Sequence, residues 1–324
     1  MTDARLKWGI LGTGMIAGKF AADLPQSNTG GLVAAGSRTQ ASADRFAGEY
    51  GGRGVEGYEA LVNDPEVQAI YNSLPNGLHH EWSIKAMRAG KHVLCEKPFA
   101  LNVAEAEEMF AVARETGMVL IEAFMYRAHP QTQKLIEMVR GGVIGDLRLI
   151  RSAFTFYKEP SMDDARYHPS QGGGAIMDVG TYCVNLTRQL AGSEPTEMQA
   201  IAHLYEGDGV DDYAAGMMRF GNDLLTTFTC GMTVYSDQGT YIAGTGGTIK
   251  INSFWFCKEG FTIIKDGQEE FVTVDEARPL YAVEADAFAA SVLDGEAPWV
   301  SSADTLGNMR AMDALRASAG VPVE

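Results

Sequence analysis

The sequence predicts an α/β protein in which a doubly wound parallel sheet is followed by an α+β domain with a large open, mostly antiparallel sheet. Short apolar runs alternate with amphipathic segments through about residue 124, a pattern typical of parallel strands joined by crossover helices. Beyond residue 140, strand-like runs follow one another directly, which favours antiparallel pairing. The length of 324 residues is enough for two domains. We therefore assign residues 1–124 to a first domain and residues 125–324 to a second.

The expected elements follow from the apolar periodicity and from the turn residues that separate the runs. In the first domain, strands are expected at 6–11, 32–36, 68–73, 92–95 and 119–123, with helices beginning near Met15, Ser42, His79 and Val103. In the second domain, strands are expected at 147–157, 196–205, 212–220, 223–234, 247–252, 261–265 and 269–274. Helical segments are expected at 131–141, at 174–186 and in two stretches after Tyr281.

The first strand leads into a glycine-rich turn, Gly12-Thr13-Gly14-Met15-Ile16-Ala17. Gly12 can bend the chain sharply, Gly14 lets backbone N–H groups approach a pyrophosphate, and the small Ala17 permits close helix packing. The helix N-terminus then offers unpaired N–H groups to phosphates. Taken alone, this motif is also compatible with an ordinary strand-to-helix turn. With the alternating pattern around it, it predicts a Rossmann dinucleotide-binding domain in which Gly12, Thr13, Gly14, Met15 and Ile16 contact the cofactor.

The second strand ends in Ser37-Arg38, where a dinucleotide fold that binds NAD usually carries an acidic residue. A hydroxyl followed by a guanidinium suits a 2′-phosphate, because Arg presents several charged donors to phosphate oxygens. The alternative is a solvated surface arginine. We predict that Ser37 and Arg38 contact the cofactor and that NADP(H) is preferred over NAD(H).

The third and fourth strands add candidates at the same edge of the sheet, because the carboxyl ends of parallel strands meet there. Further cofactor-side candidates are Leu74, Pro75, Asn76, His79, Glu96 and Lys97. His79 could instead be structural, since a histidine at a helix start often is. Lys97 follows an apolar strand and precedes Pro98, so its ammonium can reach into the cleft, whereas an isolated lysine would be a solvated surface residue. Lys97 is the leading catalytic candidate.

A helical stretch in the second domain places Asp178, Tyr182 and Asn185 on one face, next to an apolar stripe. This spacing puts a carboxylate beside a phenol. A tyrosine on an otherwise apolar helix is also compatible with a core position.

Composition excludes several classes of function. The net charge of −16, from 26 basic and 42 acidic residues, opposes binding to nucleic acids and to anionic membranes. The four cysteines are far apart and show no C-x-x-C spacing, so neither a metal site nor a disulfide framework is indicated. No apolar stretch reaches the roughly 20 residues of a membrane-spanning helix, and the N-terminal run lacks the pattern of a secretory signal. We expect a cytoplasmic protein.

Three motifs together resemble the Gfo/Idh/MocA family of NAD(P)-dependent sugar oxidoreductases. They are Gly12-x-Gly14-x-x-Ala17, Glu96-Lys97-Pro98 and Glu122-Ala123-Phe124-Met125-Tyr126-Arg127-x-His129-Pro130. The last segment is similar to the branch that contains glucose–fructose oxidoreductase and the dimeric dihydrodiol, or NADP-xylose, dehydrogenases. The resemblance extends over essentially the whole chain, and it adds Arg127 to the cofactor-side candidates.

The resemblance implies roles for the second-domain residues. Most members carry D-x-G-x-H with histidine as the proton carrier, whereas this chain has Asp178-Val179-Gly180-Thr181-Tyr182, as in the branch where tyrosine takes that role. The mechanism we expect has Tyr182 exchanging the proton, Lys97 lowering the phenol pKa and bonding the reacting oxygen, and Asp178 anchoring a neighbouring hydroxyl. The resemblance also places the segment before residue 172 near the substrate, so the substrate-side candidates are Asp178, Tyr182, Asn185, Arg166 and His168. The alternative for Arg166 and His168 is an ordinary surface loop.

The sequence therefore predicts an NADP(H)-dependent oxidoreductase that transfers a hydride between nicotinamide and a sugar, polyol or related cyclic hydroxyl or carbonyl compound. An aldose dehydrogenase, a dihydrodiol dehydrogenase and a ketosugar reductase all remain open. The alternative is a non-catalytic dinucleotide-binding regulatory protein on the same fold, which would not need Lys97 together with Tyr182. An open sheet face and the resemblance predict a homodimer or homotetramer through the C-terminal sheet.

Overall fold

The computed structural model describes residues 5–205, 209–221 and 223–323, and the chain folds into two compact units. The first unit comprises Met1–Ala128 and Ala277–Leu306, and the second comprises His129–Glu276 and Gly307–Glu324. Residues 277–306 thus belong to the first unit, although a simple division after residue 124 places them in the second. The division between the units falls within the last helix, α10 (Ser302–Ser318).

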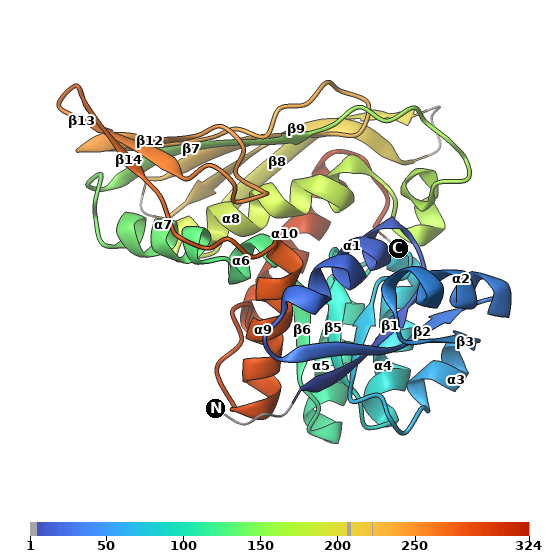
Figure 1. The fold of residues 1–324 in the computed structure, drawn as a ribbon. Helices are drawn as coiled ribbons and strands as arrows, with labels where there is room; N and C mark the ends of the chain where they lie inside the picture. Colours follow the sequence, from blue (N-terminus) through green and yellow to red (C-terminus); the bar gives the residue numbers. More distant parts are fainter. Residues whose placement is uncertain (1–4, 206–208, 222, 324) are drawn as a thin grey trace. The chain divides into compact units, whose positions relative to one another are not determined.

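The first unit is built on a six-stranded parallel sheet in the order β3-β2-β1-β4-β5-β6 (Figure 1). Its strands are β1 (Leu6–Leu11), β2 (Gly30–Ser37), β3 (Arg53–Glu56), β4 (Ala69–Asn72), β5 (His92–Glu96) and β6 (Leu120–Ala123). The strand order reverses between β1 and β4, and in doubly wound sheets this is the point where ligands bind. The predicted parallel, doubly wound sheet is confirmed.

Side chains cap the first turns of two helices of this unit. The helices are α1 (Met15–Asp23), α2 (Gln40–Tyr50), α3 (Tyr58–Val62), α4 (His79–Arg88), α5 (Val103–Thr116), α6 (Met125–Ala128) and α9 (Leu280–Leu293). The Thr39 side chain accepts a hydrogen bond from the Ser42 N–H at the start of α2, and Asn102 does the same for the Glu105 N–H at the start of α5. Gly117 ends α5 in the left-handed region.

Helix α9 joins the first unit through aromatic packing and a carboxylate. Phe288 lies 5.0 Å from the ring of Trp8, and Tyr281 lies 6.3 Å from the ring of Phe20. Asp286 accepts hydrogen bonds from the Ser27 and Thr29 side chains, both at 2.6 Å. These contacts explain why residues so far apart in the chain form one compact unit.

The second unit contains an eight-stranded sheet in the order β14-β13-β12-β11-β7-β10-β9-β8. Its strands are β7 (Leu147–Thr155), β8 (Pro195–Leu204), β9 (Asp211–Phe220), β10 (Leu225–Gly231), β11 (Thr240–Gly244), β12 (Gly247–Ile251), β13 (Phe261–Lys265) and β14 (Gln268–Val272). Strands β7 and β10 pair in parallel, and the other neighbours pair antiparallel. The predicted mostly antiparallel sheet is confirmed.

One face of this sheet is covered by helices and the other is open. Helices α7 (Pro130–Arg140) and α8 (Thr181–Ala191) lie along one face (Figure 1), and α8 packs on β7 and β10. Along β9 the side chains from Tyr213 to Phe220 alternate between exposed and buried, because successive residues of a strand point to opposite faces. The open face keeps large apolar side chains exposed, among them Ile201 and Met217.

The sequence-based prediction misses two strands and two short helices, α3 and the four-residue α6. Strand β3 lies at the edge of its sheet, and its four residues include two exposed charged side chains, so it lacks an apolar run. Strand β11 is flanked by Gly239 and ends at Gly244, and these glycines obscure the apolar pattern of its five residues. Helix α3 has five residues, which is too short for a helical period to show.

All four cysteines are free and buried. Within the described ranges, no helix combines the length and the apolar character that crossing a membrane requires. The same residues contain no group of three or more His, Cys, Asp or Glu side chains arranged to hold a metal ion.

Candidate active site

The glycine turn after β1 leaves an open helix N-terminus. Gly12 has a φ of +95°, and a Cβ there would lie 3.3 Å from the Leu74 side chain, so glycine fits this bend best. Gly14 is the N-cap of α1, and no side chain caps the helix in the described structure. A Cβ at Gly14 would meet nothing within 4 Å, which means that the space over the helix N-terminus is open. Backbone N–H groups at such an end attract phosphates.

The end of β2 meets this turn through two hydroxyl groups. The Thr13 and Ser37 side-chain oxygens lie 3.2 Å apart, and either can donate. Arg38 follows on the surface with an exposed side chain. The structure thus brings together Thr13, Gly14 and Ser37, and it leaves the Arg38 guanidinium accessible beside them.

A hollow of about 440 Å³ lies beside the same turn, and its lining adds five polar residues to the sequence-based candidates: Lys19, Ser42, Arg45, Glu49 and Tyr50. Ser42 and Arg45 of α2 line it together with Thr13, Gly14 and Met15. No sequence motif marked these two residues. Lys19 and Arg45 bring positive charge to the hollow beside the glycine turn, and Glu49 brings a negative charge.

The segment after β4 places Leu74 and His79 in the interior. His79 is fully buried, with Nδ1 2.9 Å from the Pro98 oxygen and Nε2 2.8 Å from the Leu74 oxygen. Burial lowers the pKa of His79 to about 4, so the ring is neutral and only one of these contacts is an N–H donating to a carbonyl. The ring joins the loop after β4 to Pro98, and a contact of His79 with a cofactor remains a prediction. Asn76 begins a one-turn helix, Asn76–Leu78, and is partly exposed. Pro75, which precedes it, is exposed.

Glu96 holds the backbone of the catalytic candidate. The Tyr71 hydroxyl donates to Glu96 Oε1, and the Lys97 backbone N–H donates to Glu96 Oε2 over 3.1 Å. Glu96 is buried, whereas the Lys97 side chain is partly exposed. Glu96 therefore fixes the position from which Lys97 leaves the sheet, and Tyr71 is a supporting residue that no sequence motif indicated.

A second carboxyl is buried close to Glu96. Neither carboxyl oxygen of Glu284, in α9, has a hydrogen-bond partner among the described residues. Burial, followed by the charge of Glu96, raises the pKa of Glu284 well above its usual range. Burial also raises the pKa of Tyr71, with Glu96 and then Tyr281 and Glu284 adding to the shift. Burial in α9, together with the nearby charge of Glu96, therefore favours the protonated form of Glu284.

Arg127 is bound within the first unit. Its Nη1 donates to Asp304 Oδ2 over 2.8 Å, and its Nη2 donates to the Trp299 backbone oxygen over 2.9 Å. Both side chains of the ion pair are more than nine-tenths buried. These contacts anchor residues 299–304 to the end of β6 and α6, and the cofactor contact of Arg127 remains a prediction.

The segment that carries Asp178 and Tyr182 begins with an irregular turn. Residues Ile176–Gly180 form a π-helical turn that continues directly into α8. Such wide turns are rare and are frequent at functional sites. Asp211, at the start of β9, accepts a hydrogen bond from the Ile176 N–H through Oδ2 over 2.7 Å. A Cβ at Gly174, whose φ is +116°, would lie 2.2 Å from Asp211 Oδ1.

Tyr182 is surrounded by aromatic rings of the second unit. Its ring lies 5.1 Å from Phe154 and 5.6 Å from Trp255, both roughly edge to face, and Phe154 and Trp255 stack at 5.4 Å. Only 5% of Tyr182 is exposed, and Asn185 on the next turn is fully buried. The rings hold the phenol in one orientation, and Asn185 as a substrate-side residue remains a prediction.

Arg166 binds the carboxylate of Asp178. Its Nε donates to Asp178 Oδ2 over 2.7 Å, and its Nη1 lies 3.2 Å from both carboxylate oxygens of Asp164. The structure thus brings Arg166 to the turn that precedes Tyr182. His168 lies two residues further on, and its Nε2 contacts the Met162 backbone oxygen, so its ring holds the loop together.

Comparisons with known proteins agree with this arrangement. Residues 6–124 match the family described as an oxidoreductase family with an NAD-binding Rossmann fold, GFO/IDH/MocA, and residues 132–250 match the GFO/IDH/MocA C-terminal domain. The chain is 36% identical over 300 residues to dTDP-3,4-didehydro-2,6-dideoxy-α-D-glucose 3-reductase from Actinomadura kijaniata, covering 89% of this chain and 87% of the relative. It is 33% identical over 326 residues to D-xylose 1-dehydrogenase (NADP⁺) 2 from Haloferax volcanii, covering 98% and 99%. The mouse trans-1,2-dihydrobenzene-1,2-diol dehydrogenase is 32% identical over 276 residues, covering 82% and 80%.

Among solved structures, the 3-ketoreductase KijD10 from Actinomadura kijaniata, in complex with NADP and TDP-benzene, superimposes with a TM-score of 0.89 at 31% identity. The alignment covers 97% of this chain and 98% of KijD10. The two family matches together span more than half of the chain, and the relatives extend across nearly all of it. The protein belongs to the GFO/IDH/MocA family of oxidoreductases, with an NAD-binding Rossmann fold in its N-terminal part.

Proposed function

We propose that this protein is an NADP(H)-dependent oxidoreductase that transfers a hydride between nicotinamide and a sugar, a polyol or a related cyclic hydroxyl or carbonyl compound. The observation that carries the proposal is the contact of Thr13 with Ser37 at the open N-terminus of α1, followed by the accessible Arg38. These groups suit a pyrophosphate and a 2′-phosphate. The relatives support the choice of cofactor, since KijD10 was solved with NADP and the xylose dehydrogenase is named for NADP⁺.

The proposed catalytic residues are Lys97 and Tyr182, with Asp178 as the partner that orients the substrate. A bound nicotinamide supplies or accepts the hydride, so the protein must bind the substrate and move the hydroxyl proton. Tyr182 exchanges that proton, and Lys97 donates a hydrogen bond to the reacting oxygen while its charge favours the phenolate. KijD10 has also been solved with a single lysine or a single tyrosine replaced, so the same two residue types were singled out in a relative.

The substrate class follows from what the relatives share. Their names describe a ketosugar reductase, an aldose dehydrogenase and a dihydrodiol dehydrogenase, and each acts on a hydroxyl or carbonyl carbon of a small ring or sugar. We propose the same class here, with the direction of the reaction to be determined by assay.

The test is the absorbance of reduced nicotinamide when the purified protein is given NADP⁺ or NAD⁺ with a panel of aldoses, inositols and cyclic dihydrodiols. The reverse assay offers NADPH with ketosugars. Turnover of one sugar class with NADP⁺ or NADPH supports the proposal. If NADPH binds tightly but no compound in either direction is turned over, the alternative of a non-catalytic dinucleotide-binding regulatory protein replaces it.

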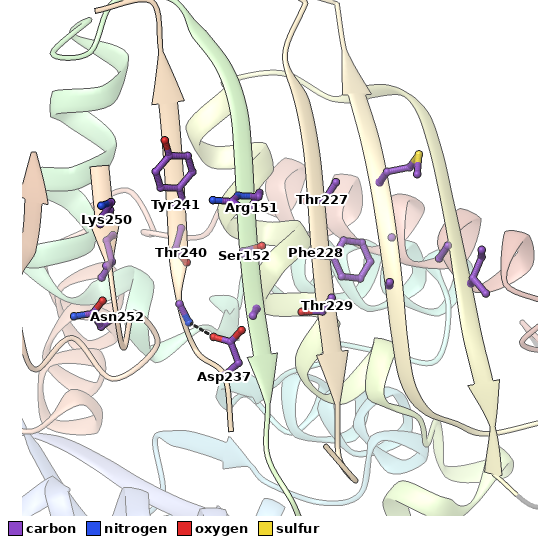
Figure 2. Close-up of a pocket in the computed structure, with 18 of the residues that line it drawn as sticks. Arg151, Ser152, Thr227, Phe228, Thr229, Asp237, Thr240, Tyr241, Lys250 and Asn252 are labelled. Carbon is purple, nitrogen blue, oxygen red and sulfur yellow. Dashed lines mark hydrogen bonds between the residues drawn. The ribbon is translucent and has the colours of Figure 1, made fainter. Parts of the chain in front are cut away.

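We also propose that the open face of the C-terminal sheet binds a second copy of the chain, giving a homodimer or a homotetramer. Figure 2 shows a shallow hollow on the sheet, with Arg151, Thr227, Tyr241 and Lys250 on four neighbouring strands. The hollow has a volume of about 700 Å³, and its lining includes the exposed Ile201 and Met217.

The size of the open face fits a dimer. Eight strands about 4.8 Å apart, each of about seven residues rising about 3.3 Å, make a face of roughly 900 Å². Each partner in a standard interface buries about 800 Å². Because the same face is present on both copies, a two-fold axis can pair it with itself. The four free, buried cysteines further support a reducing compartment, and we propose the cytoplasm.

A further inference from the structure

The helical segment that carries Asp178 and Tyr182 is held at its first turn by a residue from the sheet. The first N–H groups of a helix have no acceptor within that helix. Here the N–H of Ile176, the first residue of the π-helical turn, donates to Asp211 Oδ2 over 2.7 Å. Asp211 is the first residue of β9, and none of its surface is exposed. A buried carboxyl group from another element therefore caps this segment.

We propose that Asp211 is a positioning residue for this enzyme: by capping the first turn, its carboxylate sets the orientation in which Asp178 and Tyr182 meet the substrate. This inference rests on the proposed function, because it assumes that Asp178 and Tyr182 act on the substrate. It adds a residue that lies 35 positions from Ile176 in the chain and that no sequence motif indicates.

The first argument is the short path from Asp211 to the proposed catalytic groups. Asp178 lies two residues after Ile176, and its N–H donates to the Gly174 oxygen over 2.9 Å, so it belongs to the same turn. Tyr182 follows at the start of α8, into which the π-helical turn continues without interruption. A displacement of Ile176 therefore moves the backbone of both residues. A shift of about 1 Å in a catalytic group can lower the rate by about 10²-fold.

The second argument is that both ends of the turn lie directly against the sheet. A Cβ at Gly174 would lie 2.2 Å from Asp211 Oδ1. At the other end, a Cβ at Gly180 would lie 3.2 Å from Cys230 Sγ, in β10. Packing alone has little directional preference, whereas a hydrogen bond fixes distance and angle. The bond from Ile176 to Asp211 therefore adds a defined register to this close contact.

The third argument is that the carboxyl group lowers the stability of the fold. Burial raises the pKa of Asp211 to about 6, although the hydrogen bond from the Ile176 N–H lowers it. The favourable contribution of the protonated form is therefore complete below the ordinary value of 3.8 and is lost as the pH rises through about 6. At neutral pH the ionised group costs stability, so its place beside the turn points to a role in the reaction.

The charged and titratable groups around Asp211 come from several elements. Arg316 of α10 lowers the pKa of Asp211, and Asp212 of β9 raises it. Burial raises the pKa of the Cys230 thiol in β10 well above its usual value, and the charge of Asp211 adds to that shift. The Asp178 carboxyl lies in the turn itself. The Arg316 guanidinium and the Cys230 thiol keep their charge states near pH 6, so neither produces a titration there.

The experiment measures kcat and kcat/KM from pH 5 to pH 9 for the wild type, Asp211→Asn and Asp212→Asn. Asparagine keeps the size of aspartate and an oxygen acceptor for the Ile176 N–H, but it carries no charge and does not titrate. Asp212→Asn is the matched control, because Asp212 is the next residue and is also buried. Its carboxylate contacts the His203 ring and accepts from the Thr233 hydroxyl, and these contacts do not involve the turn.

In the wild type we expect kcat/KM to fall as the pH drops through about 6, because protonated Asp211 is a weaker acceptor for the Ile176 N–H. Asp211→Asn should lose this transition, and at pH 7.5 its kcat should be at least fivefold below the wild type, with the Kd of NADPH unchanged. Asp212→Asn should keep the wild-type kcat at pH 7.5 and move the transition to lower pH, because the charge of Asp212 raises the pKa of Asp211.

Wild-type kcat and an unchanged pH profile in Asp211→Asn overturn the proposal. If Asp211→Asn does not fold, an unshifted transition in Asp212→Asn overturns it.

Hydrogen exchange of the peptide that contains Ile176 and Asp178 gives a readout that does not depend on turnover. At pH 7.5 its amides should exchange at least tenfold faster in Asp211→Asn than in the wild type or in Asp212→Asn, and equal exchange overturns the inference. If exchange differs in this way but no sugar, polyol or related compound is oxidised or reduced, the proposed function fails while the role of Asp211 at the turn stands.

Discussion

Asp211 accepts a hydrogen bond from the Ile176 N–H over 2.7 Å, and this contact joins the start of a sheet strand to the irregular turn that presents Asp178. Asp211 is fully buried, and burial raises its pKa to about 6. The shape of the turn depends on the space next to this carboxylate, where only a glycine fits.

Gly174→Ala tests that space. The new methyl carbon would lie 2.2 Å from Asp211 Oδ1, and the φ of +116° already disfavours any side chain. We expect a loss of at least about 3 kcal/mol in the free energy of unfolding, measured by urea denaturation. Gly142→Ala is the control, since its φ is +79° but nothing lies within 4 Å of the added carbon. It should cost about 1 kcal/mol from backbone strain alone. Equal losses of unfolding free energy in the two variants would show that the Asp211 side chain moves away from the new methyl group without an energetic cost.

Lys97→Met removes the ammonium while keeping an unbranched side chain. If Lys97 bonds the reacting oxygen, kcat should fall by about 10²-fold or more, with NADPH affinity nearly unchanged. Tyr182→Phe should behave likewise. The double variant should lose little more than either single variant, because the two groups act on one proton transfer. Lys134→Met, at an exposed position of α7, is the control. Full turnover in Lys97→Met would remove this lysine from the mechanism.

Arg38→Ala tests the choice of cofactor. Losing charged hydrogen bonds to a 2′-phosphate should weaken NADPH by about 10- to 100-fold, whereas NADH, which lacks that phosphate, should be nearly unaffected. Fluorescence titration of both cofactors measures the difference, and Arg38→Lys should restore part of it. An equal loss for the two cofactors would contradict a 2′-phosphate site at Arg38.

Glu284→Gln tests the buried acid in α9. Its folded-state pKa is raised well above the ordinary value of 4.5, so its favourable contribution is complete below pH 4.5 and is lost as pH rises toward the folded-state pKa. The neutral amide of Gln does not ionise, so the variant keeps its stability as the pH rises. We expect the melting temperature of the variant to exceed that of the wild type by about 2–6 °C at pH 8, with a smaller difference at pH 5. The exposed Glu115→Gln should show no such trend. A pH-independent difference would mean that Glu284 does not titrate differently on folding.

Ile201→Arg tests the dimer. Ile201 is 77% exposed on the open sheet face, and a charge there would be buried without a partner in the interface. Light scattering after size exclusion should give the mass of a dimer or tetramer for the wild type and of a monomer for the variant. Leu293→Arg, an exposed apolar position of α9, should leave the mass unchanged. A monomeric wild type would exclude the interface.

The sequence predicted most of the architecture because strand and helix periods are local signals. Strand β1 and the start of α1 follow directly from the run before Gly12, and β13 was placed at its observed bounds. Strand β11 was missed because glycines dilute its pattern, although it lies in the middle of its sheet.

The candidate site was harder to predict, because burial and partners depend on distant residues. His79 and Arg127 have the chemistry of ligand-binding residues, but the first contacts backbone carbonyls and the second pairs with Asp304. Asp211 lies 35 residues from the Ile176 N–H that donates to it, and Glu96 raises the pKa of Glu284 from another part of the chain. A local pattern does not record such pairs. The contact of Arg166 with Asp178 was also not anticipated, although both residues were candidates.

The first compact unit has a consequence for synthesis. Trp8 packs against Phe288, and Asn28 and Thr29 bind Asp286, so the earliest strands meet partners that are translated last. On the ribosome, residues 1–128 emerge without α9, and residues 129–276 of the second unit are made before α9 follows. Until α9 is translated, part of the aromatic core of the nascent N-terminal sheet is therefore exposed to solvent. A chain truncated before residue 277 never receives α9, so it should depend on chaperones throughout its lifetime.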